Sequence, residues 1–185
     1  AATCAGLVAA CLWSIAGSWF FPSALPQNFH LIHWQDMTSY MPLIKTSFLL
    51  AVGASFAAIL AVLAWAYAAP DSNFTNRWLL SCIFMPFFIP QISFLFGTQI
   101  SLSRIGLDGT WFALVWVHMI FILPFTWLIV IPARCALDHR LDHLAATLGA
   151  SGWKRFINLH MPLMAYPLGT ALFIGISVSM ALYLP

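Results

Sequence analysis

Charged residues divide this chain into long stretches that contain none. Of its 185 residues, 7 are Lys or Arg and 5 are Asp or Glu. About 20 residues of α-helix cross the roughly 30 Å hydrocarbon core of a bilayer. Each of the main charge-free stretches is therefore long enough to span a membrane. These stretches are 1–35, 46–69, 78–103, 109–133 and 156–185.

The apolar stretches are predicted to be helices in lipid. Hydrophobic residues make up 62% of the chain, more than a water-soluble domain of this size tolerates. Strands of a membrane barrel alternate apolar and polar residues, whereas 48–69 is apolar all round. The predicted fold class is all-α, a polytopic transmembrane helical bundle in one domain, 1–185. Its five spans are expected at about 3–21, 43–69, 78–101, 110–132 and 163–185.

The few basic residues predict an orientation. If the chain starts in the cytoplasm, the segments around 70–77 and 134–161 lie inside. The outer segments then hold Arg104, and Lys45 lies at a helix mouth. Basic residues concentrate on the cytoplasmic side of membrane proteins, so a count of five to two predicts a cytoplasmic N-terminus. The five inside are Arg77, Arg134, Arg140, Lys154 and Arg155.

Several kinds of function receive no support from the sequence. The net charge of +2 is scattered and forms no basic face, so nucleic acid is not an expected partner. The four cysteines lack CxxC spacing, which argues against a metal or redox site. The chain has no phosphate-binding GxxxxGK[ST] loop, so ATP would have to be handled by a partner chain. No cofactor and no metal site are predicted.

The segment 134–161 is the most polar part of the chain. It holds four of the seven basic residues, two of the five acids and three of the six histidines. Residues 138–148 favour a helix, Gly149 and Gly152 mark a break, and 153–160 can form a second short helix before Pro162. A helix, a tight turn and a helix outside the bilayer are expected. Taken alone, this pattern also suits an ordinary amphipathic loop.

A spaced motif runs through this segment. Leu144 and Ala145 are followed by three variable residues, Ala146, Thr147 and Leu148, and then by Gly149. The residues after the glycine at characteristic spacing are Ala150, Ser151, Trp153, Phe156 and Pro162. The pattern resembles the cytoplasmic loop of type I permeases, the inner-membrane subunits of binding-protein-dependent ABC importers. That loop carries Glu-Ala-Ala, three variable residues and Gly, and it couples the permease to its ATPase.

One position departs from this motif. His143 stands where the family has its Glu, an anion that helps to hold the loop in a groove of the ATPase subunit. An imidazole cannot supply a fixed negative charge near neutral pH. The resemblance then implies one of three outcomes. Coupling of the permease to the ATPase is weakened, Asp142 takes the place of the Glu, or the domain is the less active of two halves.

The resemblance extends over nearly the whole chain and implies an assembly. The phrase GLDGTWFALVWVH is similar to the family's entry into a span, and a sixth helix is expected after Pro185. The implied protein is a multi-pass subunit of the bacterial inner membrane, in contact with membrane lipid. Its implied partners are two ABC ATPase subunits, a second permease half or subunit, and a periplasmic substrate-binding protein. SMALYLP is most similar to the thiamine, ferric-iron and polyamine branch.

Polar side chains within the predicted spans are candidates for a translocation path. Ionisable groups at membrane depth are costly and often functional, although His118 also suits a hydrogen bond to a neighbouring helix. Serines two residues apart face different sides of a helix, so they cannot all line one path. The candidates are Gln91, Ser93, Gln99, His118, Ser177, Ser179 and Tyr183.

Two rival functions can be stated. An integral-membrane enzyme acting on a lipid would use His118 or the acidic and histidine residues of 138–143. A secondary transporter driven by ions would need acidic groups within its spans. The sequence contains no Glu, and none of its five Asp residues lies deep in a predicted span. A transport subunit without enzymatic activity of its own is therefore the main prediction.

Overall fold

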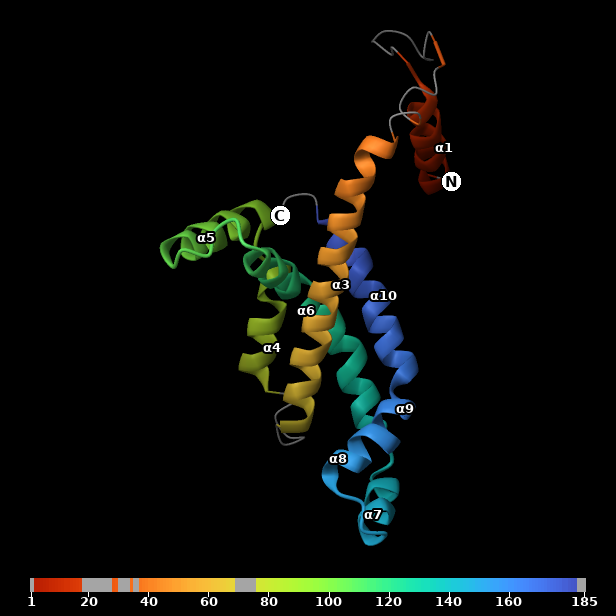
Figure 1. Ribbon diagram of the computed structural model, residues 1–185, viewed down its shortest axis with the longest axis vertical. Helices are drawn as coiled ribbons and strands as arrows, with labels where there is room; N and C mark the ends of the chain where they lie inside the picture. Colours follow the sequence, from red (N-terminus) through yellow and green to blue (C-terminus); the bar gives the residue numbers. More distant parts are fainter. Residues whose placement is uncertain (1, 18–27, 30–33, 35–36, 69–75, 183–185) are drawn as a thin grey trace. The chain divides into compact units, whose positions relative to one another are not determined.

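The computed structural model describes residues 2–17, 28–29, 34, 37–68 and 76–182, which are mostly helical (Figure 1). Among them, the strand-like pairing is an isolated bridge between Ala16 and Phe29. The predicted all-α class is confirmed. The elements are α1 (Ala2–Ile15), α3 (Met37–Ala68), α4 (Arg77–Phe84), η2 (Met85–Phe87), α5 (Gln91–Arg104), α6 (Trp111–Cys135), α7 (His139–Thr147), α8 (Gly152–Arg155), the π-helix η3 (Phe156–His160), α9 (Met161–Leu163) and α10 (Ala165–Ala181).

The long apolar helices fit a membrane bundle. Within the described ranges, α3 and α6 are long and apolar enough to cross a bilayer. Two bent pairs, α4–η2 with α5 and α8–α9 with α10, raise the number to four if each pair is one span. The short apolar helix α1 overlaps the predicted span 3–21, of which 18–21 lie outside the described residues. The number of five spans stays a prediction.

The predicted span 78–101 is divided by a sharp bend. The chain direction bends by 106° between the helices on the two sides of residues 88–90. Pro90 has no backbone N–H, and its carbonyl accepts the first hydrogen bond of α5, from the N–H of Phe94 at 3.1 Å. By contrast, Pro124 is buried inside α6, which continues through it. Proline at a helix boundary therefore redirects the chain, whereas α6 is packed against its neighbours and continues past Pro124.

The chain divides into two compact units, Ala1–Thr46 and Ser47–Pro185. In the first unit, the indole N–H of Trp34 donates to Ser14 Oγ at 3.2 Å. The N–H of Gly17 also donates to the carbonyl of Asn28 at 2.8 Å. These contacts connect the end of α1 with the segment that follows it.

The core of the second unit lies between α3, α6 and α10, which run side by side in Figure 1. Ile59 and Val62 of α3 pack with Trp127 and Val130 of α6, and Ala171 of α10 joins them. Small residues such as Ala54 and Ala58 are fully buried against α6, as is common where membrane helices approach closely. This packed core fixes the ends of α6 and α10, between which the polar segment extends.

Candidate functional site

Residues 138–163, here called the polar hairpin, form two helices joined by a tight turn (Figure 1). The first helix, α7, begins after Asp138, whose side chain accepts the N–H of Arg140 at 2.8 Å. Aspartate at this position satisfies one of the free N–H groups of a helix start. The helix–turn–helix that the sequence predicts is present.

Gly149 forms the turn between the two helices. Its φ of +81° lies in the left-handed region. Its N–H donates to the carbonyl of Ala146 at 2.9 Å, and the N–H of Ala150 donates to the carbonyl of Ala145 at 3.0 Å. This pair of bonds is a Schellman motif, in which the residue after the helix cap is usually Gly. Ser151 then caps α8 by accepting the N–H of Lys154 at 3.4 Å.

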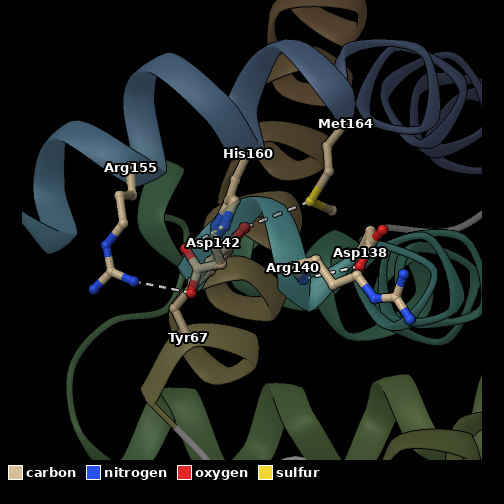
Figure 2. A network of polar contacts seen from close by, with 7 residues as sticks. All are labelled: Tyr67, Asp138, Arg140, Asp142, Arg155, His160 and Met164. Carbon is tan, nitrogen blue, oxygen red and sulfur yellow. Dashed lines mark hydrogen bonds and ion pairs between the residues drawn. The ribbon is translucent and has the colours of Figure 1, made fainter. Parts of the chain in front are cut away.

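An ion pair holds the two helices of the hairpin together. Arg155 Nη1 lies 2.9 Å from Asp142 Oδ2, and His160 Nε2 lies 3.3 Å from Asp142 Oδ1 (Figure 2). The Asp142 side chain is only 35% exposed, whereas His143 beside it is exposed. The Asp142 carboxylate, next to the motif position that His143 occupies, is therefore paired with Arg155 inside the hairpin.

Tyr67, near the end of α3, joins the hairpin to the apolar helices. Its ring meets Phe156 edge-on at 4.9 Å and stacks on His160 at 5.4 Å, measured between ring centres. The guanidinium of Arg134, in the last turn of α6, lies 4.9 Å from the same ring centre. The Tyr67 hydroxyl donates to Met164 Sδ at 3.6 Å. One side chain thus contacts the ends of several helices.

The His160 ring is buried at the base of the hairpin, outside the predicted spans. Burial lowers the pKa of this imidazole, with a smaller opposing effect from the Asp142 carboxylate, which raises it. Because the lowered pKa favours the neutral ring, we expect His160 to be uncharged at neutral pH. The contact between His160 and Asp142 is then a polar contact and not an ion pair. Arg155 is the charged partner of the Asp142 carboxylate.

An apolar stripe remains exposed on the hairpin. Leu144, Leu148 and Trp153 are 60%, 88% and 70% exposed. Leu141 and Leu144 of α7 precede Leu148, the cap residue of this helix, at helical spacing, so these three leucines lie on one side. Leu148 is absent from the sequence-based candidates because it occupies a variable motif position, although this periodicity could have revealed it. Large apolar side chains at the tip of a polar loop are typical of a protein-binding surface.

The other predicted loop residues divide by burial. Ala145, Ala150 and Phe156 are partly buried within the hairpin or against Tyr67. The exposed ones are His143, Ala146, Gly149, Ser151 and Pro162. Tyr67, Arg134, Arg155 and His160 were not among the candidates, since contacts between distant segments leave no local pattern.

Of the predicted path residues, the structure brings together His118 and Ser179. His118 Nδ1 lies 2.6 Å from Ser179 Oγ, and both residues are buried between α6 and α10. Ser177 is exposed and its hydroxyl donates to the carbonyl of Phe173 in its own helix at 2.9 Å. In α5, Ser93 and Gln99 are exposed and Gln91 is partly buried. Tyr183 lies outside the described residues.

No group of three or more His, Cys, Asp and Glu side chains suited to a metal is found in the part of the chain that the structure describes. Asp138 caps α7 and Asp142 is paired with Arg155, so both carboxylates have structural roles.

Comparison with known proteins identifies relatives. The chain is 33% identical over 132 residues to the inner membrane ABC transporter permease protein YnjC of Escherichia coli (strain K12), which covers 71% of this chain and 25% of that protein. It is 28% identical over 108 residues to the putative 2-aminoethylphosphonate transport system permease protein PhnV of Salmonella typhimurium, covering 57% of this chain and 41% of the relative. The PhnV protein of Salmonella typhi is 27% identical over the same length. No family model matches the chain. The chain thus spans about a quarter to two fifths of these relatives.

Proposed function

We propose that this chain, a homologue of the inner-membrane permeases of ABC transporters, is part of the membrane-spanning subunit of an ATP-driven importer. In this role its apolar helices form part of the translocation path, and the polar hairpin couples them to an ATPase. The chain acts as a transport subunit, and ATP is hydrolysed in a partner. No observation on the described residues favours the rival enzyme acting on a lipid.

The exposed apolar stripe is the observation that carries this proposal. Leu144, Leu148 and Trp153 lie on a hairpin whose charged pair, Asp142 and Arg155, faces inward. Burying large apolar and aromatic side chains provides most of the affinity at protein interfaces. The stripe also needs no anion at position 143. We infer that apolar contact takes over the holding role of the family's Glu, so that His143 does not prevent docking.

Tyr67 gives the hairpin a route to the apolar helices. A force on the hairpin passes through Phe156 and His160 to Tyr67 on α3, and through Arg134 to α6. Packed contacts of this kind move helices as units, because tightly packed interfaces shift between discrete arrangements. Closure of the ATPase subunits would thereby tilt α3 and α6 and alternate access to the path.

The assembly follows from this role. We place the hairpin and the N-terminus on the cytoplasmic side of a bacterial inner membrane, as the distribution of basic residues predicts. Two ABC ATPase subunits, a second permease half or subunit and an extracytoplasmic substrate-binding protein complete the transporter. The thiamine, ferric-iron and polyamine branch stays a prediction, since the name of YnjC gives no substrate and PhnV is named for 2-aminoethylphosphonate.

Site-directed cross-linking tests the docking role. The exposed native cysteines, Cys4, Cys11, Cys82 and Cys135, are first replaced by alanine in the complete transporter. Leu148→Cys or Trp153→Cys is then expected to cross-link to an ATPase subunit in native membranes. Tyr166→Cys is the matched control, because this side chain is 86% exposed but lies outside the hairpin. The docking role is wrong if neither hairpin cysteine captures an ATPase subunit.

Substitution of Tyr67 tests the route through α3. Tyr67→Leu removes the ring contacts with Phe156, His160 and Arg134, and is expected to lower transport per ATP hydrolysed by about threefold or more, since such contacts contribute about 0.5–1.5 kcal/mol. Tyr67→Phe keeps the ring and is expected to retain most of the transport. Substrate uptake and ATP hydrolysis are measured together in proteoliposomes. Equal ratios for the two variants would remove Tyr67 from the coupling route.

A further inference from the structure

A cavity of about 600 Å³ opens where the polar hairpin meets the apolar helices. Its polar end is formed by the last turn of α6 and by the two helices of the hairpin. Its apolar end is formed by α3. The lining residues are Leu60, Leu63, Ala64, Tyr67, Arg134, Asp142, Gly152, Trp153, Arg155, Phe156 and His160.

The polar end of the cavity carries more positive than negative charge. Arg134 Nε and Arg155 Nε are buried donors without a hydrogen-bond partner, and Asp142 Oδ1 is a buried acceptor without one. Two arginines, Arg134 and Arg155, and one carboxylate, Asp142, line the cavity, which leaves one positive charge when His160 is neutral. Buried donors without partners are costly, so this end of the cavity is suited to an anion with several acceptor oxygens.

The apolar end leads out to the surface of α3. Leu60 is 52% exposed, and Leu63 and Ala64 continue the wall toward Tyr67. This part of α3 belongs to a helix long and apolar enough to cross a bilayer, so its exposed face suits acyl chains. Trp153 and Tyr67 lie at the junction of the two ends, as aromatic residues commonly do at a membrane interface.

We propose that this cavity binds an anionic phospholipid of the adjacent leaflet, with its phosphate at Arg134 and Arg155 and an acyl chain along Leu60, Leu63 and Ala64. A phosphodiester carries one negative charge, which matches the one excess positive charge of the cavity. Basic pockets between membrane helices recognise lipid headgroups in this way. Free phosphate would make no use of the apolar wall. Lipid binding does not require the transport role proposed above, although Tyr67, Arg134 and Trp153 take part in both.

Lipid retention tests this site. The complete transporter is extracted from nanodiscs of equal parts phosphatidylglycerol and phosphatidylcholine, and retained lipids are counted by native mass spectrometry. We expect phosphatidylglycerol to be retained in preference. Arg134→Gln should lower that preference about fivefold, the effect of one basic group near the membrane surface. Arg140→Gln is the control, since Arg140 lies exposed on the same hairpin and does not line the cavity; it should leave the preference unchanged.

A variant of opposite sign separates binding from folding. Asp142→Asn removes the carboxylate that pairs with Arg155, so both arginines become available to the phosphate. The preference for phosphatidylglycerol should therefore rise, whereas general damage to the hairpin would lower it. An equal or lower preference in this variant overturns the proposal.

Two further arms distinguish other occupants. If soluble glycerol 3-phosphate displaces phosphatidylglycerol as well as added phosphatidylglycerol does, the cavity recognises a free phosphate and the lipid site is wrong. If the lipid is retained only after the ATPase subunits are removed, the cavity is part of a protein interface, and the lipid site is again wrong. Retention unaffected by both treatments is the result that the proposal predicts.

Discussion

The Gly149→Val variant is expected to lose at least about tenfold in the stimulation of ATP hydrolysis by the loaded binding protein. Position 149 has φ +81°, and its turn is closed by hydrogen bonds from Gly149 and Ala150 to the end of α7. Left-handed backbone costs an L-residue roughly 1–2 kcal/mol, and a β-branched side chain makes it worse. The turn between α7 and α8 would then adopt another conformation, and Leu148 and Trp153 would lose their relative positions.

Two matched variants separate the backbone from the side chain. Gly149→Asn is expected to keep most of the stimulation, because Asn tolerates the left-handed region and is found at this helix-end position. Gly152→Ala should be nearly neutral, since the added Cβ meets only Arg155 Nη2 at 4.0 Å and the backbone there is not left-handed. ATP hydrolysis is measured in proteoliposomes containing the complete transporter. Full stimulation in Gly149→Val would falsify the role of this turn.

Local sequence signals predicted the hairpin but not its attachments. Asp138, Gly149 and Ser151 act through hydrogen bonds to residues within five positions, and such chemistry can be read from spacing. Tyr67 is 97 residues from Met164 and Asp142 is 13 from Arg155. No short-range pattern encodes these pairs, because they depend on how α3 packs against α6 and α10. The residues that link the hairpin to the core were therefore missed.

The apolar spans show the same division between local and tertiary information. The long stretches predicted helices, and α3 (Met37–Ala68) and α6 (Trp111–Cys135) cover nearly all of the predicted ranges 43–69 and 110–132. Pro86 and Pro90 lie within the predicted span 78–101, but the bend of 106° depends on where α5 packs after Pro90. The sequence allowed two roles for His118, in helix packing or in the translocation path. Its hydrogen bond to Ser179 supports packing, and a role in the path stays a prediction.

The Gly175→Ala variant is expected to destabilise the helical core by about 1–3 kcal/mol, the usual cost of overpacking. A Cβ at Gly175 of α10 would lie 2.7 Å from Ser55 Oγ and 2.9 Å from Ser55 Cβ, distances that real Cβ atoms do not reach. Ser55 is completely buried in α3 and its hydroxyl donates to the Ala51 carbonyl at 2.7 Å. The serine cannot move aside without separating α3 from α10.

Thermal unfolding of the purified, detergent-solubilised protein measures this effect, and two variants on the same helices make it specific. Gly169→Ala places a Cβ in open space on α10 and is expected to be neutral or stabilising, because alanine favours a helix more than glycine does. Adding Ser55→Gly to Gly175→Ala removes both close atoms and should recover part of the lost stability. The contact with Ile122 Cγ2 at 3.1 Å remains, which limits the recovery. If Gly175→Ala and Gly169→Ala unfold at the same temperature, α3 and α10 do not pack at this distance in the protein.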